Sequence, residues 1–203
     1  MAPRFVARQL ANPHGMFGHV IGHLMNRHNA RMNAFAVREL DPQSTDRILE
    51  IGFGGGATLR PLIASGADIT GLDRSRVMVA RAQRQFRQAI ATGRAIFVQG
   101  QVEELPFAPN AFDKVCTVNT VYFWASLEAG FTEIHRVLAS GGRVVVGFLP
   151  REHMDRMMMP ADIFTTRAPS DIFAALRTNG FDDVRVERPD PAVAWCIVRA
   201  RRP

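Results

Sequence analysis

The sequence is poor in several residue types, and each shortage narrows what the protein can be. Among 203 residues it has two cysteines, and among its 25 basic residues only one lysine, Lys114. No apolar run approaches the ~18 residues that a membrane span needs. The N-terminal stretch has no hydrophobic block of the kind found in secretion signals. We therefore expect a cytoplasmic protein without membrane-spanning segments.

The cysteine and histidine positions do not predict a metal centre. Cys116 and Cys196 lie inside apolar, β-like runs without metal-ligand spacing, so we expect buried free thiols. Four histidines gather near the N-terminus: His14, His19, His23 and His28. Because no cysteine or paired acid flanks them, we expect no metal site there.

The net charge of +6 comes almost entirely from arginine. An arginine-rich chain can meet nucleic acid, anionic lipid or an acidic substrate. Here the arginines are scattered, with mild clusters over residues 74–94 and 199–202 in which Phe86 is the one aromatic residue. We therefore favour a solvated surface and expect no nucleic-acid partner.

Hydrophobic periodicity predicts alternating strands and helices. Residues 17–40 show helical spacing of apolar residues, and Asp41-Pro42 ends that helix. Strands are predicted at 46–51, 67–73, 94–100, 112–119 and 143–149, and helices at 57–65, 75–91, 126–138 and 169–179. Two β-like runs, 183–189 and 192–200, close the chain with a short link. This order predicts an α/β fold with a parallel sheet and a terminal antiparallel hairpin.

A glycine-rich stretch, ILEIGFGGGATL over residues 48–59, follows the first predicted strand. Glycine permits left-handed backbone and lets a ligand lie against the main chain. In an open parallel sheet such a ligand lies beyond the carboxyl ends of the strands. Asp73 ends the second predicted strand, where a carboxylate can accept hydrogen bonds from both ribose hydroxyls. The pattern predicts a site for an adenosine-like ligand.

Two ligand classes compete for this site. Gly52, Gly54 and Ala57 satisfy the dinucleotide fingerprint G-x-G-x-x-G/A. However, Glu50 would repel a pyrophosphate, whereas it would attract a ligand that carries a cationic amine and a sulfonium. About 45 residues precede the motif, and only about 55 follow the fifth strand, which leaves no second catalytic domain for hydride transfer.

Four stretches in order carry a family resemblance: ILEIGFGGG, ITGLDRSRVM, GQVEELPFAPNAFDKV and VLASGGRVVV. Over roughly residues 46–199 the sequence resembles the class I S-adenosylmethionine-dependent methyltransferases of the small, single-domain bacterial type. The resemblance implies a Rossmann-like, doubly wound, seven-stranded sheet with a C-terminal antiparallel hairpin and an N-terminal helical extension. It divides the chain into a helical cap (1–45) and a methyltransferase domain (46–203), with a substrate-side lid over residues 150–168.

The resemblance also implies S-adenosylmethionine as cofactor, with S-adenosylhomocysteine as product. The implied cofactor-binding residues are Glu50, Gly52, Phe53, Gly54, Gly56, Asp73, Arg74, Gln101, Val102, Glu103 and Asn119. Gln101 departs from the family, since many relatives have aspartate at that position. Its amide oxygen can still meet the adenine amino group.

The expected substrate pocket lies at the end of the fourth strand. Asn119 and Tyr122 share the N-x-x-Y spacing of the Asn-Pro-Pro-Tyr motif in amino-methylating relatives, without its prolines. We predict Tyr122, the only tyrosine, as a catalytic residue that hydrogen-bonds the nucleophile. The predicted substrate-binding residues are Asn26, Asn29, Tyr122, Phe123 and Trp124. The alternatives are that the aromatic residues pack under a loop and that the asparagines form polar surface.

The sequence thus predicts in-line methyl transfer to a small-molecule acceptor. A phosphatidylethanolamine-type phospholipid N-methyltransferase at the membrane surface is the main alternative, although membrane association is not favoured. From other classes, a dinucleotide-dependent oxidoreductase or a non-catalytic cofactor-binding protein stays open. The acceptor atom and the oligomeric state are not set by the sequence.

Overall fold

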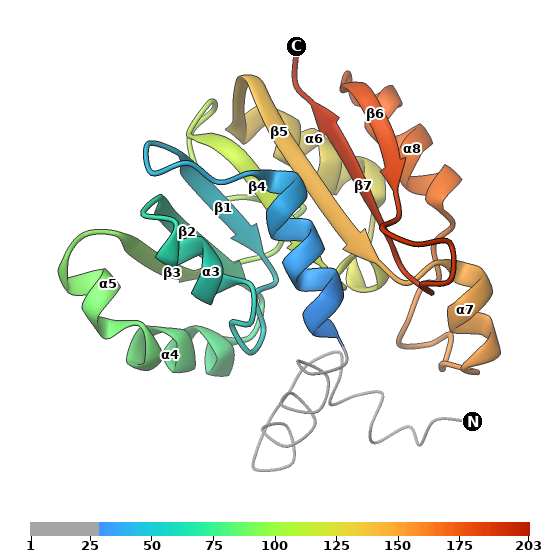
Figure 1. Cartoon of the computed structure of the whole chain (residues 1–203), viewed down its shortest axis with the longest axis horizontal. Helices are drawn as coiled ribbons and strands as arrows, with labels where there is room; N and C mark the ends of the chain where they lie inside the picture. The colour runs from blue at the N-terminus through green and yellow to red at the C-terminus, as the bar shows by residue number, and fades with distance from the viewer. Residues whose placement is uncertain (1–28) are drawn as a thin grey trace.

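A seven-stranded mixed sheet forms the middle layer of the computed structural model, which describes residues 29–203 (Figure 1). Its strands are β1 (Arg47–Ile51), β2 (Asp68–Asp73), β3 (Ala95–Gln99), β4 (Phe112–Val118), β5 (Leu138–Phe148), β6 (Asp182–Glu187) and β7 (Cys196–Arg201). They lie in the order β3-β2-β1-β4-β5-β7-β6, and β7 runs antiparallel to both neighbours. The predicted fold class, including the terminal hairpin, is confirmed.

Helices cover both faces of this sheet. They are α3 (Leu59–Ala64), α4 (Arg76–Gln85), α5 (Arg87–Ala91), α6 (Leu127–Val137), α7 (Arg151–Arg156) and α8 (Pro169–Thr178), with a helix over residues 29–40. Alternate strand residues point to opposite faces, as the pleat requires. Ile48 and Cys116 enter one apolar core with the 29–40 helix, α3 and α4. Leu49 and Val115 enter the other with α6 and α8.

The helix over residues 29–40 crosses the front of the sheet in Figure 1. Met32, Phe35, Ala36 and Leu40 bury its apolar stripe against the body. Its C-terminal carbonyls are held from the sheet, because the Arg143 guanidinium donates to the carbonyl oxygens of residues 39 and 40 at 2.8 and 3.4 Å. The predicted helix extends back to residue 17, and that part lies outside the described residues.

The only lysine of the chain ties this helix end to the sheet. The Lys114 ammonium donates to the Asp41 carbonyl and lies 2.7 Å from the Asp46 carboxylate. Both side chains of this ion pair are largely buried, at 13% and 14% exposed. A compact ammonium on a long stem can reach two oxygens at such a corner.

Two predicted helix boundaries are wrong. The helix predicted over 75–91 is two helices, because helical geometry is lost at Phe86 (φ −109°, ψ 27°), whose ring packs against Phe97 at 5.7 Å. The helix predicted over 126–138 ends at Val137, and β5 begins at once. Leu138 already pairs with Phe112 across the sheet, so strand pairing starts five residues before the strand predicted at 143–149.

The two cysteines are free and buried, as predicted. Cys116 lies on β4 and Cys196 on β7, with β5 between them. Among the described residues, no helix is long and apolar enough to cross a bilayer. The domain boundaries expected from the sequence remain predictions.

Candidate functional site

A cavity of about 210 Å³ opens at the carboxyl ends of β1, β2 and β4. Its wall is formed by segments 50–55, 72–75, 100–103 and 118–120, with further side chains from the 29–40 helix and the turn after β4. This is the edge at which a doubly wound sheet places its ligands. The strand order therefore brings together residues as far apart in the sequence as Glu50 and Thr120, about 70 positions.

Most predicted site residues meet at this cavity. Those that line it are Asn29, Glu50, Gly52, Phe53, Gly54, Asp73, Arg74, Gln101, Val102, Glu103, Asn119, Phe123 and Trp124. Gly56 and Tyr122 do not line it, and Asn26 lies outside the described residues. Asn33, Thr120 and Met78 line it without having been predicted as site residues. The i, i+4 spacing of Asn29 and Asn33 on one helix face was the signal available for Asn33.

The loop after β1 needs glycine at Gly52. Its φ is 72°, a left-handed conformation that side chains disfavour. Its N–H donates to the Leu72 carbonyl oxygen at 2.7 Å, which holds the loop against β2. A Cβ at Gly52 would lie 2.4 Å from the Thr120 Cγ2 atom. The loop therefore lies directly against the end of β4.

Gly56 has a packing role in the same turn. Its φ is 75°, and its N–H donates to the Phe53 carbonyl oxygen at 2.8 Å. A Cβ there would lie 3.2 Å from the Phe86 ring. Gly56 therefore lets the loop pack against Phe86 on the side away from the cavity, while Gly52 and Gly54 line the cavity.

The Asp73 carboxylate holds the glycine loop by hydrogen bonds and can still accept hydrogen bonds from a ligand. Its Oδ2 accepts from the Gly54 N–H and its Oδ1 from the Ser75 N–H, both at 2.8 Å. Burial raises the pKa of this carboxyl, while the two backbone hydrogen bonds and the Arg74 charge oppose that shift. Because each carboxylate oxygen has two lone pairs, each can still accept one further donor from a ligand.

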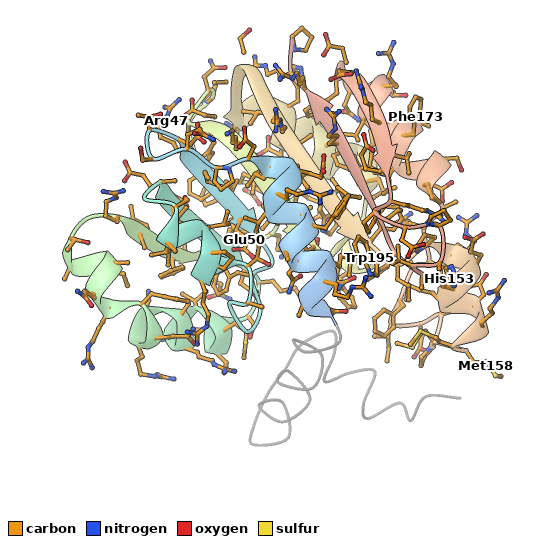
Figure 2. The ribbon with its side chains drawn as sticks, in the orientation of Figure 1. Arg47, Glu50, His153, Met158, Phe173 and Trp195 are labelled. Atoms are coloured by element: carbon orange, nitrogen blue, oxygen red, sulfur yellow. The ribbon has the colours of Figure 1, made fainter. Side chains whose placement is uncertain are left out.

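Glu50 is the most unusual group in the wall. Figure 2 shows it near the carboxyl end of β1. Its side chain is buried, and its Oε2 atom has no hydrogen-bond partner among the described residues. Burial raises its pKa to about 8; Thr58 opposes the shift by hydrogen bonding, and the Asp73 charge adds to it. A buried acceptor without a donor is rare in native proteins, so this atom is suited to a donor, above all a cationic one, that arrives with a ligand.

The end of β4 is held in a left-handed turn. Asn119 has φ 59°, which asparagine tolerates better than most residues. Its N–H donates to the Gly147 carbonyl oxygen at 2.7 Å. Two residues before Asn119, the Thr117 hydroxyl donates to the Ile51 carbonyl oxygen at 3.0 Å and shares a short hydrogen bond with the Thr120 hydroxyl. These bonds hold the ends of β1, β4 and β5 together under the cavity.

Tyr122 lies behind this turn. Its hydroxyl donates to the Asn119 Oδ1 atom at 3.1 Å and accepts from the Leu149 N–H. The side chain is buried among aromatic neighbours, including Phe164, and burial raises its pKa. These contacts give the hydroxyl a positioning role on Asn119, whereas its predicted contact with substrate stays a prediction.

The remaining predicted residues frame the mouth. Glu103 accepts from the Ala125 N–H at 2.7 Å, which joins the 100–103 segment to the turn after β4. The exposed Arg74 places its guanidinium carbon 5.6 Å from the centre of the Phe123 ring. Phe53 packs edge-on against Phe97 at 5.6 Å. Trp124 is buried against Phe131, so it forms a wall and not a free surface.

The segment predicted as a lid contains α7 and packs behind the wall, with the centre of the Phe164 ring 5.0 Å from that of Phe123. No residue between 150 and 168 lines the cavity. Met154 is buried, whereas Met157 and Met158 are each 55% exposed. Figure 2 shows Met158 at the outer edge of the molecule. A lid function for this segment therefore remains a prediction.

Within residues 29–203, no group of three histidine, cysteine, aspartate or glutamate side chains is placed to hold a metal ion. The chemistry available at the cavity is that of buried carboxylates, a bare glycine loop and neutral amides. This set suits an adenosine-like ligand with a positive charge near Glu50.

Comparison with known proteins agrees with this geometry. Residues 49–146 match the family model described as a methyltransferase domain. The chain is 28% identical over 188 residues to the uncharacterized methyltransferase YdaC of Bacillus subtilis (strain 168), covering 91% of this chain and 98% of that protein. It is 30% identical over 122 residues to the sterol 24-C-methyltransferase ERG6B of Gibberella zeae, covering 60% of this chain but only 32% of that protein.

Among solved structures, the fold is similar to geranyl diphosphate C-methyltransferase from Streptomyces coelicolor A3(2), solved with Mg²⁺, geranyl diphosphate and S-adenosyl-L-homocysteine. The TM-score is 0.72 at 15% identity, over 87% of this chain and 78% of that chain. At this identity the likeness shows the fold alone. The sequence matches given above are to proteins described as methyltransferases.

Proposed function

We propose that this chain is a class I S-adenosylmethionine-dependent methyltransferase, whose cavity binds S-adenosylmethionine and directs its methyl group to a small-molecule acceptor; its match to a methyltransferase domain over residues 49–146 supports this. The observation that carries the proposal is the buried Glu50 Oε2 atom, which has no hydrogen-bond partner within residues 29–203 and lies beside a left-handed glycine loop and the Asp73 carboxylate.

The residues present fit this cofactor. Its ammonium would pair with Glu50, which otherwise stays neutral because of burial. Its ribose hydroxyls would donate to the free lone pairs of Asp73. The bare backbone at Gly52 and Gly54 would admit its methionine portion. Residues 101–103 would lie along its adenine, as the family resemblance implies.

When bound, the cofactor supplies a methyl group that is already activated on a sulfonium. The chain itself mainly has to orient the acceptor and exclude water. On the described wall, Asn29, Asn33 and Asn119 offer amides that can hydrogen-bond an acceptor, and Phe123 offers an apolar face. None of these side chains titrates near neutral pH, so their part is binding and alignment.

The proposal is tested by titrating the full chain with S-adenosylmethionine, S-adenosylhomocysteine, NAD and NADP in a calorimeter. We expect dissociation constants on the order of micromolar for the first two only, an affinity of about −8 kcal/mol. Asp73→Asn should weaken binding at least ~10-fold, since it replaces one acceptor oxygen by a donor.

Asp68→Asn is the matched control. It makes the same chemical change on β2, but at the exposed amino end, where Asp68 pairs only with Arg94. Its affinity should equal that of the unmodified protein. Tight binding of NAD or NADP in place of the methionine cofactors would overturn the proposal. Once cofactor binding is established, acceptors can be screened with labelled methyl donor, with phosphatidylethanolamine included as the lipid alternative.

A further inference from the structure

The positive charge of the chain is unevenly distributed along the sequence. Residues 74–102 contain six arginines and no acidic residue, since Glu103 is the first acid after Asp73. Residues 1–38 contain five more arginines and again no acid, since the first acid of the chain is Glu39. The whole chain carries only +6, so the rest of it is net acidic.

In the structure, the first of these segments forms α4, α5 and β3. Arg76, Arg84 and Arg87 are exposed and Arg81 is half-buried. Within residues 29–203, none of these four makes an ion pair, whereas Arg94 pairs with Asp68 at 3.2 Å. Residues 1–28 contain no carboxylate side chain, so they cannot pair these arginines either.

Exposed aliphatic side chains lie among these arginines. On α4, Val77 is 45% exposed and lies four and seven positions before Arg81 and Arg84, on the same helix face. On α5, Ile90 is 37% exposed, three positions after Arg87. The opposite side of α4 buries Met78, Val79 and Ala82 against the body. The outer surface of these helices, here called the basic face, is therefore both cationic and partly apolar.

The basic face adjoins the mouth of the cavity. Arg74 and Ser75 precede α4, and these two residues and Met78 line the cavity wall. In Figure 1, α4 lies along the lower edge of the molecule, the side on which β1 ends. A surface that docked here would lie beside the opening.

We propose that the basic face docks on the surface of an anionic lipid bilayer. Unpaired arginines are attracted to acidic head groups, and the aliphatic side chains between them can enter the boundary between head groups and acyl chains. Arginine stems also cover apolar surface while their charged heads stay in water. The inference does not depend on methyl transfer, because its test measures binding alone.

A nucleic acid would also be attracted to the arginines through its phosphates, but it would not explain the exposed aliphatic side chains among them. Proteins that hold single strands present aromatic side chains on which bases stack. Phe86, the one aromatic residue between Arg74 and Arg94, packs inward against Phe97, and the centre of its ring lies 5.9 Å from the Arg60 guanidinium carbon. The interleaved Val77 and Ile90 favour the lipid surface.

The test is co-sedimentation of the full chain with vesicles of phosphatidylcholine plus phosphatidylglycerol, and with phosphatidylcholine alone, at ~0.15 M salt, where the Debye length is about 8 Å. We expect binding to the anionic vesicles only, and release at high salt. Arg84→Glu with Arg87→Glu should reduce partitioning at least ~10-fold. The same pair changed to alanine should give a smaller loss.

The control is Arg156→Glu with Arg177→Glu, which makes the same change in net charge. Arg156 and Arg177 are exposed in the last turns of α7 and α8, as Arg84 is in the last turn of α4. This variant should bind vesicles within ~2-fold of the unmodified chain, and all variants should keep the same affinity for S-adenosylmethionine. Equal loss in both variants would show a general charge effect and overturn the proposal. Binding to a single-stranded oligonucleotide but not to anionic vesicles would overturn it as well.

Discussion

At the scale of single residues, Glu50 links the sequence to the chemistry of the cavity. Its place two positions before Gly52 marked it as an acid that a pyrophosphate would not tolerate. The structure adds that the side chain is buried and that one of its oxygens lacks a partner among the described residues. With a pKa of about 8, it is mostly protonated at neutral pH until a cation arrives.

The affinity for S-adenosylmethionine should therefore rise with pH. Below about pH 8, pairing with the ligand ammonium requires Glu50 to lose a proton, so binding releases protons and strengthens as pH increases. We expect a gain of on the order of tenfold or more between pH 6 and pH 8, and a plateau above. Calorimetry over this range, in buffers of different ionisation enthalpy, measures both the affinity and the protons released.

Glu50→Gln provides the comparison. It should bind weakly, with an affinity that does not change over the same pH range. Because a raised carboxyl pKa favours the neutral folded form, the unliganded protein should lose stability as pH rises from about 4.5 towards 8, and Glu50→Gln should not. A pH-independent affinity of the unmodified protein would show that Glu50 does not pair with the ligand charge.

Tyr122→Phe should lower stability more than it changes ligand binding. The hydroxyl accepts from the Leu149 N–H and donates to Asn119, so its removal leaves a partly buried N–H unpaired, at a cost of about 1–3 kcal/mol. Thermal unfolding measures this cost. Phe123→Leu, on the neighbouring ring that lines the cavity, is the contrast, with a larger effect on binding at the cavity. Unchanged unfolding with reduced turnover would instead support the predicted substrate contact.

At the scale of elements, the glycine loop was recognisable from the sequence, but the reason for each glycine was not. Gly52 and Gly56 both have left-handed backbone, yet one lies against Thr120 and the cavity and the other against Phe86. Sequence spacing cannot separate these roles, since both partners come from other elements.

Gly52→Ala should abolish cofactor binding, whereas Gly93→Ala should not affect it. Both glycines have φ above 70°, so alanine costs about 1–2 kcal/mol of backbone strain at either position. Only at Gly52 would the new Cβ meet another atom, Thr120 Cγ2 at 2.4 Å, whereas nothing lies within 4 Å at Gly93. Thermal unfolding of the two variants measures the cost of backbone strain, which both share. Calorimetry measures cofactor affinity, which only the Cβ clash at Gly52 should lower. Equal affinities in both would contradict the assigned contact.

Two helices end at positions that the sequence pattern did not predict. Helical periodicity continues through Phe86, yet its ring packs on β3 and the helix divides there. Likewise, Leu138 leaves α6 to pair with Phe112. In both cases a tertiary contact overrides a local helical preference, which is only a weak determinant.

At the scale of the whole molecule, the order of the strands decides which distant residues meet. The two cysteines illustrate this, since one strand separates them and burial raises the pKa of both, that of Cys196 to about 11. We expect neither thiol to react with a thiol reagent in the native protein, and both to react after denaturation. A reductant should leave the unfolding temperature unchanged. Rapid labelling of the native state would contradict the burial of these strands.

The sequence by itself determined the alternation of strands and helices, the glycine turn after β1, the acids Glu50 and Asp73, and with them the resemblance to methyltransferases. These features are local, because turn conformation, pleat and helical periodicity depend on neighbouring residues. Only the tertiary structure decided that Tyr122 is buried behind Asn119, that Thr120 closes the loop, and that unpaired arginines gather on α4 and α5. Those outcomes depend on packing between elements, which brings together residues that local patterns leave unrelated.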